Sequence, residues 1–219
     1  MNGYSKIKSF AKINLALNVL GKSLSIHKIE SIVSFLGLND EIFVKEINKN
    51  KHIIKFIGKF SKNIGKINTI SKLLEILDKK NLLKDKKYAI KIKKNIPTQA
   101  GLGGGSMNAA TFFKFLIKKQ KIKISQKKIG EISNFVGSDV ILGMYCKNLI
   151  LKSNGSINII SNVESKNVLV IKPNFGCSTK KIYSKVKKFN SSRFKKPNKK
   201  LFSYLELKKM SNDLEIIAL

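Results

Sequence analysis

A glycine-rich segment between a strand and a helix constrains the fold of this chain more than any other feature. Four of the chain's 14 glycines lie within residues 101–105. The alternating side chains of residues 88–96 (YAIKIKKNI) predict a strand, and the run from Ser106 to Lys119 predicts a helix. Glycines that lead into a helix let backbone N–H groups converge, and the helix N-terminus adds unpaired donors and partial positive charge. This order of elements therefore predicts a phosphate-binding loop.

Three common glycine loops fit this segment poorly. A Walker A loop requires a lysine after its last glycine, but Gly105 is followed by Ser106 and Met107. A Rossmann GxGxxG that starts at Gly101 needs glycine where Ser106 stands, and it would follow the first strand of a βαβ unit. The protein-kinase glycine loop lies between two strands instead of before a helix. The structural alternative is a flexible turn without a ligand.

The remaining periodicity predicts an α+β domain, with strands early in the chain and helices later. Expected strands are 6–20, which ends at Gly21, an apolar segment 29–38, a strand after a turn at 39–40, a strand within 51–60, and a buried strand at 167–173. Expected helices start at an Asn68 or Thr69 cap, run from Ser125 to Gly137, begin at a Ser178 or Thr179 cap, and occupy the last 19 residues. Residues 187–200 read as a basic polar loop.

The formal net charge of +31 has two interpretations. A strongly basic chain suggests nucleic acid or an anionic surface as a partner. However, only one of the 44 basic residues, Arg193, is an arginine, the residue that nucleic-acid readers favour for bidentate and stacking contacts. Lysine, isoleucine and asparagine are also the residues that AT-rich codons encode, and the lysines are spread over the whole length. We therefore favour codon bias over nucleic-acid binding, although a phosphate-bearing substrate would approach this surface favourably.

Targeting signals and cysteine pairing point to the cytoplasm. The chain contains no apolar run of the ~18 residues that a membrane helix needs. Its first ten residues, MNGYSKIKSF, lack the continuous apolar region of a secretory signal. Cys146 and Cys177 form no CxxC pair and are expected to be free thiols.

The glycine segment and six further motifs resemble the GHMP small-molecule kinases. PTQAGLGGGSMNAA is similar to that family's P-x-x-x-G-L-G-[GS]-[GS]-S-x-x-A, and its S-x-N-A-A ending is closest to the branch that phosphorylates 4-diphosphocytidyl-2-C-methyl-D-erythritol in the non-mevalonate isoprenoid pathway. The other motifs follow in the family's order: FAKINLALNVLGK (10–22), IHKIESIVSFLGLNDEI (26–42), Asn68 at a helix start, VGSDVILGMY (136–145), NVLVIKPNFGCSTKKIY (167–183) and SNDLE (211–215).

The resemblance implies a GHMP kinase N-terminal domain, of the ribosomal protein S5 domain 2-like fold, over residues 1–150. Residues 151–219 would then be only the start of the family's C-terminal α+β subdomain. Relatives continue for roughly another third of this length and carry a late glycine loop that nothing here matches. We therefore expect a shortened, divergent member, or a fragment, that is less stable than a full-length relative.

The activity that the resemblance implies is ATP-dependent phosphorylation of the 2-hydroxyl of the diphosphocytidyl substrate. Phosphoryl transfer needs held phosphates, charge neutralisation and a base for the attacking oxygen. Asp139 is the expected base and Lys12 its partner, although an aspartate at a helix start is also a common cap. Mg²⁺ would accompany the phosphates, with no direct protein ligand assigned. The expected ATP-binding residues are Pro97, Thr98, Gln99, Ala100, Gly101, Leu102, Gly103, Gly104, Gly105, Ser106 and Met107.

Four residues are expected to bind the small-molecule substrate: Asn14, His27, Asn108 and Tyr183. By the resemblance, His27 hydrogen-bonds the cytosine ring and Tyr183 stacks on it, a contact worth ~1–3 kcal/mol. No membrane is expected as a partner, nucleic acid is disfavoured, and the chain would be a monomer or a homodimer.

Several positions depart from the family pattern. Ile26 replaces an aromatic residue beside the cytosine, Met107 replaces a serine near the metal or phosphates, and Gly143 and Met144 interrupt the P-F-F run after the aspartate. These departures keep two other readings open: a degraded member that binds nucleotide without turnover, and a basic RNA-binding module.

Overall fold

The computed structural model describes residues 3–23, 26–119, 122–173 and 175–218, and it has the expected α+β composition. The chain forms two compact units, each assembled from several segments. The first unit contains residues 1–11, 37–98 and 102–146, and the second contains residues 12–36, 99–101 and 147–219. Whether residues 1–150 and 151–219 act as separate domains stays a prediction. None of the described helices is long and apolar enough to cross a membrane.

The sheet of the first unit is built around β4 (Lys87–Lys93), the strand that precedes the glycine segment. Its alternating side chains bury one row against the helices, as the sequence predicts. β4 pairs antiparallel with residues 41–47 of β2 (Ile26–Ile47), and parallel with β3 (Ile53–Ile57). β1 (Ser5–Ser23) also pairs with β2.

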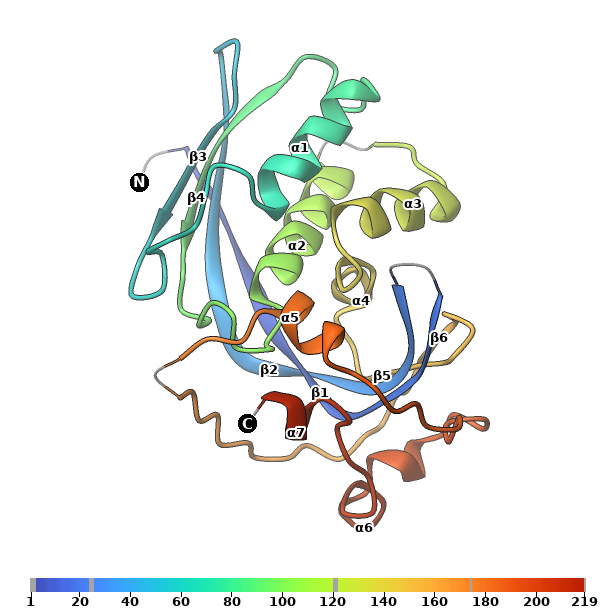
Figure 1. Ribbon diagram of the computed structural model, residues 1–219. Helices are drawn as coiled ribbons and strands as arrows, with labels where there is room; N and C mark the ends of the chain where they lie inside the picture. Colours follow the sequence, from blue (N-terminus) through green and yellow to red (C-terminus); the bar gives the residue numbers. More distant parts are fainter. Residues whose placement is uncertain (1–2, 24–25, 120–121, 174, 219) are drawn as a thin grey trace. The chain divides into compact units, whose positions relative to one another are not determined.

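Helices cover one face of this sheet (Figure 1). They are α1 (Thr69–Lys79), α2 (Gly104–Lys119), α3 (Gln126–Val136) and α4 (Val140–Tyr145). α1 begins at the predicted cap, because Asn68 and Ser71 form a reciprocal capping box. Ser125 caps α3 as expected, through a hydrogen bond from the backbone N–H of Lys128. The core between sheet and helices is apolar, and Phe112 and Phe113 of α2 are completely buried in it.

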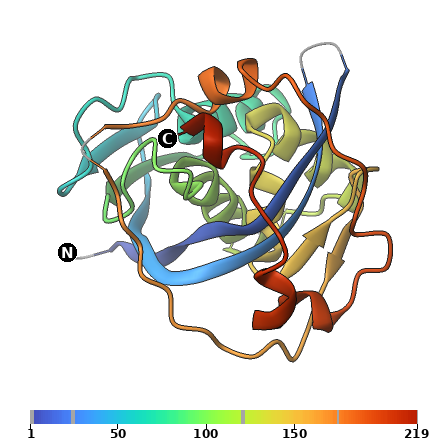
Figure 2. The same cartoon turned by 60° about the horizontal axis from the view of Figure 1, so that its bottom comes forward.

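In the second unit, residues 31–33 of β2 pair antiparallel with β5 (Leu149–Leu151), which pairs in turn with β6 (Ile157–Ile159), so that all six strands belong to one sheet. Its helices are short: α5 (Thr179–Ser184), the 3₁₀ helix η1 (Lys199–Phe202), α6 (Tyr204–Leu207) and α7 (Glu215–Ala218). The segment that leads to α7 runs along β1, where Leu17 forms a bridge with Asn212 (Figure 2).

A buried carboxylate fastens the basic loop 187–200 to the second unit. Glu30 on β2 is completely buried and accepts hydrogen bonds from Asn18 Nδ2 (2.8 Å) and Ser192 Oγ (2.7 Å). It also accepts the backbone N–H groups of Arg193 and Phe194. These four donors compensate the cost of burying the charge. The predicted loop is therefore held in place by one side chain distant in sequence.

Three expectations about secondary structure are wrong. β2 continues without a turn through residues 39–40. The last 19 residues form short separate helical turns instead of one helix. Residues 167–173 form no strand, and Leu169 is 84% exposed and Ile171 81% exposed. A strand exists only when its backbone pairs with a neighbour, and no described strand pairs with this segment.

Candidate active site

The glycine segment adopts the backbone conformations that its composition predicts. Gly101 (φ +71°) and Gly103 (φ +64°) lie in the left-handed region, where residues with a side chain are strained. α2 then begins at Gly104, two residues earlier than expected, and Met107 N donates to Gly103 O at 2.9 Å. The first N–H groups of a helix have no acceptor within it. The N-terminus of α2 can therefore offer backbone donors to an anion.

Two close contacts explain the glycines at the start of α2. A Cβ on Gly104 would lie 3.0 Å from Ile96 Cγ2 and 3.3 Å from Lys94 Nζ. At Gly105, the carbonyl oxygen accepts a 2.7 Å hydrogen bond from Thr69 Oγ1, at the first residue of α1. The start of α2 thus lies against residues 94–96, which follow β4, on one side and is tied to α1 on the other.

A cavity of about 420 Å³ lies between β3 and the segment that leads into α1. Apolar side chains and polar groups both contribute to its lining, which includes His52, Ile54, Phe56, Ile64, Lys66 and Asn68. Asn68 caps the helix whose first residue, Thr69, binds Gly105. This cavity therefore borders the same helix start that anchors the glycine segment. Sequence reasoning did not identify it, because its lining combines residues without a motif.

His52, in the lining of this cavity, is held as a neutral ring with a defined tautomer. Its Nδ1 accepts the backbone N–H of Tyr88 at 3.0 Å, so the proton must be on Nε2, which lies 3.0 Å from Asp78 Oδ2. Burial lowers the pKa of His52 below its usual value of 6.5, and the Asp78 carboxylate opposes this shift only in part. The side chain is therefore an acceptor for the backbone, not a cation.

We expect this histidine to make the fold sensitive to mild acid. The unfolded chain takes up a proton near pH 6.5, whereas the folded chain does so only at lower pH. The contribution of His52 to the free energy of unfolding is complete above pH 6.5 and is lost as pH falls below it. Urea unfolding between about pH 5 and pH 7.5 should show a steeper loss for wild type than for His52→Gln. Equal slopes for the two proteins would contradict this assignment.

Asp139 stands at the N-cap position of α4 but does not cap the helix. The structure gives its side chain no hydrogen bond to the first turn of α4. The common structural reason for an aspartate at this position is therefore missing. Gly137, two residues earlier, lies against α2, because a Cβ on it would be 3.6 Å from Ser106 Oγ. The turn that carries Asp139 is thus placed beside the start of α2.

Two residues that depart from the expected motifs, Met107 and Gly143, lie against each other. Met107 is buried, and a Cβ on Gly143 would lie 3.0 Å from its sulfur and 2.6 Å from Ala110 Cβ. The methionine faces inward, and glycine at 143 lets α4 approach α2 closely.

In the second unit, a chain of hydrogen bonds orients Lys12 and Asn14. Ser31 Oγ donates to Ala16 O (2.7 Å), so it accepts from Asn14 Nδ2 (2.7 Å), and Asn14 Oδ1 is left to accept from the Lys12 ammonium. Lys12 is only 6% exposed. Ser31, which sequence reasoning did not assign, sets this orientation. The pairing of Lys12 with Asp139 stays a prediction.

His27 and Tyr183, the two residues expected to bind the base, lie together in the second unit. Their ring centroids are 5.0 Å apart and the ring planes are inclined by 39°. They come from the start of β2 and from α5, 156 residues apart in the chain (183 − 27). The side chain of Ile26 lies outside the described side chains.

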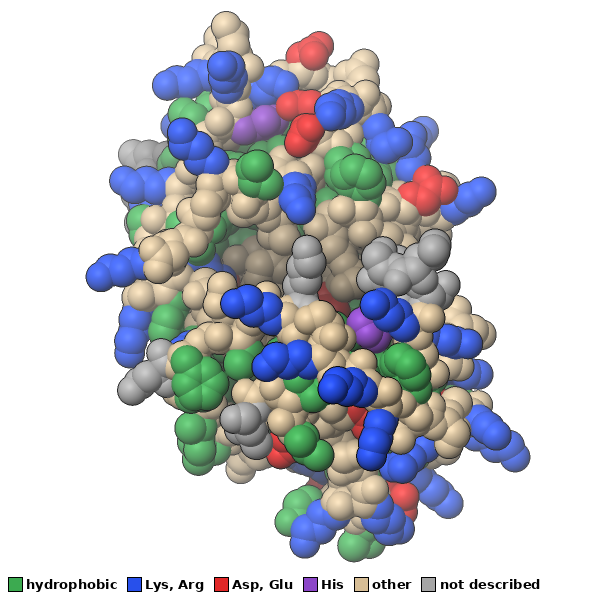
Figure 3. Space-filling view, in the orientation of Figure 1, with side chains coloured by type: hydrophobic (Ala, Val, Ile, Leu, Met, Phe, Trp, Pro, Cys, Tyr) green, Lys and Arg blue, Asp and Glu red, His purple; other side chains and the backbone are tan. Residues whose placement is uncertain are grey.

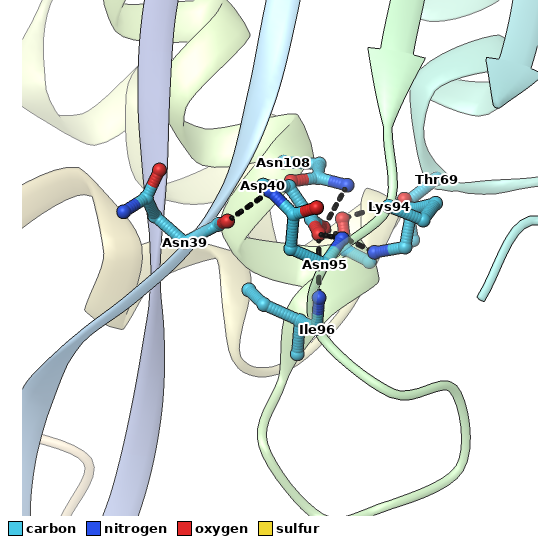
Figure 4. Close-up of polar contacts among 8 residues, drawn as sticks. Asn39, Asp40, Thr69, Lys94, Asn95, Ile96 and Asn108 are labelled. Carbon is cyan, nitrogen blue, oxygen red and sulfur yellow. Dashed lines mark hydrogen bonds and ion pairs between the residues drawn. The ribbon is translucent and has the colours of Figure 1, made fainter. Parts of the chain in front are cut away.

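Asn108 belongs to a buried polar cluster around Asp40 (Figure 4). Its Nδ2 donates to Asp40 Oδ2 at 3.0 Å, and within the described residues no donor reaches its buried Oδ1. Lys94 forms an ion pair with the same carboxylate. Sequence reasoning missed Asp40 and Lys94, although the expected motif contains the aspartate.

Lysines are scattered over the visible face of the molecule and do not form one patch (Figure 3). This distribution resembles the even spread of lysine along the sequence. A positive potential without a patch attracts anions generally and selects none of them. In the described ranges, no three His, Cys, Asp or Glu side chains are grouped as a metal site. Both Cys146 and Cys177 are free, as expected.

Comparison with known proteins gives consistent relatives. Residues 68–147 match the family model of the GHMP kinases N terminal domain. All 219 residues align at 56% identity with the 4-diphosphocytidyl-2-C-methyl-D-erythritol kinase of Pelagibacter ubique (strain HTCC1062), and they cover 78% of that protein. The kinase of the same name from Thermoanaerobacter pseudethanolicus is 33% identical over 186 residues, which are 84% of this chain and 63% of that relative.

Solved structures share the fold. A crystal structure of a 4-(cytidine 5'-diphospho)-2C-methyl-D-erythritol kinase has a TM-score of 0.68 at 19% identity, over 98% of this chain and 77% of that one. A homoserine kinase from Cytophaga hutchinsonii has a TM-score of 0.56 at 16% identity, over 85% of this chain and 61% of the other. At these identities the likeness concerns the fold alone.

Proposed function

Because the chain belongs to the 4-diphosphocytidyl-2-C-methyl-D-erythritol kinases, a branch of the GHMP kinases, we propose that it transfers the terminal phosphoryl group of ATP to the 2-hydroxyl of 4-diphosphocytidyl-2-C-methyl-D-erythritol. The observation that carries this proposal is the helix start at Gly104, whose backbone donors lie beside the turn that holds Asp139. A phosphate site next to a carboxylate is what transfer to a hydroxyl requires. The proposal includes a cytoplasmic location, where ATP and a polar substrate are both in solution.

We assign the nucleotide to the first unit. Residues 102–105 and the N-terminus of α2, which belong to that unit, would hold the ATP phosphates through backbone N–H groups. The apolar and polar lining of the cavity beside α1 suits an adenine ring, which has flat apolar faces and a polar edge. Mg²⁺, carried by the phosphates, would supply the neutralisation of their charge. The hydrogen bond from Thr69 to Gly105 holds the glycine segment beside the cavity.

We assign a residue to proton transfer, to orientation of the attacking oxygen and to binding of the cytosine. Asp139 would accept the proton of the substrate hydroxyl as that oxygen attacks phosphorus. The Lys12 ammonium, oriented by Asn14 and Ser31, would orient the attacking oxygen. In the second unit, His27 and Tyr183 would hold the cytosine by a hydrogen bond and by stacking. Asn108 Oδ1, which accepts no hydrogen bond within the described part of the chain, suits a hydroxyl donor of the ligand.

The test is a direct assay of the wild-type chain with the diphosphocytidyl substrate, ATP and Mg²⁺, following both ADP release and product mass. We expect stoichiometric formation of the monophosphorylated product. ATP binding without any turnover would overturn the kinase proposal in favour of a nucleotide-binding relative. Tight RNA binding with a steep dependence on salt, and no ATP binding, would replace it with a nucleic-acid role.

A further inference from the structure

One buried carboxylate fixes the chain on both sides of the glycine segment. Asp40 on β2 is completely buried. Its Oδ1 accepts the backbone N–H groups of Asn95 (2.7 Å) and Ile96 (2.8 Å), directly before the segment. Its Oδ2 accepts from Asn108 Nδ2 (3.0 Å), on α2 directly after the segment, and pairs with the Lys94 ammonium (Figure 4).

The hydrogen-bond donors around the Asp40 carboxylate can be arranged in only one way. An ionised carboxylate only accepts hydrogen bonds and has about four lone-pair positions, so four donors saturate it. Bonds to an ionised acceptor are shorter and stronger than bonds between neutral groups. Asn108 must therefore turn its amide nitrogen toward Asp40. Lys94 is 3% exposed, so its cation also has little freedom to move away.

The groups on Asp40 in turn touch the start of α2. The site of a Cβ on Gly104 is 3.3 Å from Lys94 Nζ and 3.0 Å from Ile96 Cγ2. Lys94 and Ile96 therefore lie directly beside the first residue of α2. Residues 95 and 96 lie beyond the end of β4, so the described sheet does not hold them. Their backbone N–H groups depend on the side chain of Asp40 instead.

We propose that Asp40 is a positioning residue that presets the glycine segment for nucleotide phosphates before any nucleotide binds. This inference rests on the nucleotide site of the proposed function. Asp40 acts through Lys94, Asn95, Ile96 and Asn108. A preset loop avoids the free-energy cost of ordering on binding, which would otherwise reduce the apparent affinity by the fraction of competent molecules.

The first experiment compares Asp40→Asn with Glu41→Gln, the same chemical change one residue along β2 on an ion-paired carboxylate. In Asp40→Asn, an amide NH₂ must face either the two backbone donors or Lys94 and Asn108. Calorimetric titration with a non-hydrolysable ATP analogue and Mg²⁺ should give a Kd about tenfold higher at unchanged stoichiometry. Glu41→Gln should stay within about twofold of wild type, since Glu41 contacts none of these groups.

The outcomes separate the two proposals. A lower stoichiometry with an unchanged Kd would show that Asp40 only keeps molecules folded, and it would overturn the positioning role. Wild-type binding with an unaffected Asp40→Asn would overturn this inference alone. Absence of binding by wild type would overturn the nucleotide site itself.

A second measurement uses only the wild-type protein, so it does not depend on whether a variant folds. We expect the backbone amides of Asn95 and Ile96 to be protected from hydrogen exchange in nucleotide-free wild-type protein, because Asp40 already binds them. Protection that appears only after the ATP analogue is added would mean that the nucleotide orders the segment, and the positioning role would be wrong.

Discussion

Replacing Asp139 by asparagine should lower kcat for phosphoryl transfer by about 10²–10⁴-fold, the usual contribution of a positioned general base. The amide cannot accept the proton of the substrate hydroxyl. The variant should fold normally, because an amide has nearly the same size and shape as the carboxylate it replaces. Affinity for an ATP analogue should stay within about twofold, since in the proposed function backbone groups of the glycine segment hold the phosphates.

Glu131→Gln is the matched control. It makes the same carboxylate-to-amide change on an exposed position of α3, in the same unit. Its kcat should equal that of wild type. A kcat for Asp139→Asn within about tenfold of wild type would show that the aspartate is not the base.

Adding one methyl group at Gly143 should destabilise the fold by about 1–3 kcal/mol. The new Cβ would lie 2.6 Å from Ala110 Cβ and 3.0 Å from the Met107 sulfur, so α4 must move away from α2. Because the residue before α4 is Asp139, this displacement should also lower kcat. Urea unfolding followed by circular dichroism would measure the loss.

Two further variants test whether the contact at residue 143 causes the loss of stability. Gly130→Ala on α3 has nothing within 4 Å of its Cβ, and a helical glycine-to-alanine change in open space should stabilise by about 0.5–1 kcal/mol. Ala110→Gly removes the methyl group that Gly143→Ala strikes. The double variant should therefore be less destabilised than the two single changes add up to, by about 0.5 kcal/mol or more. Additive effects would mean that residues 110 and 143 do not limit the approach of α4.

Local patterns in the sequence identified the elements around the glycine segment. The alternation before the glycines became β4, and the caps at Asn68 and Ser125 stand where the sequence places them. These signals depend on neighbours within a few residues along the chain. The same is true of the left-handed glycines, whose conformations follow from the missing side chain.

Patterns that need a distant partner were misleading. The apolar run 167–173 has the composition of a buried strand, yet Leu169 and Ile171 are exposed, because no described strand pairs with that backbone. The polar pair at 39–40 suggested a turn, yet β2 continues there and directs Asp40 into the interior. Composition could not distinguish these outcomes, because a hydrogen-bond partner from elsewhere in the chain decides each of them.

The amino-acid sequence therefore established the class of fold, the order of strand, glycine segment and helix, and the kinase family, because local spacing carries all three. The hydrogen bonds that hold the glycine segment form only in the folded chain. The four donors on Asp40 come from positions 54 to 68 residues further along the chain. Met107 and Gly143, which look like two separate losses in the sequence, meet across α2 and α4 as one packed contact. Contacts between residues distant in sequence depend on which buried surfaces pack together. The periodicity of side chains along the chain does not reveal this packing.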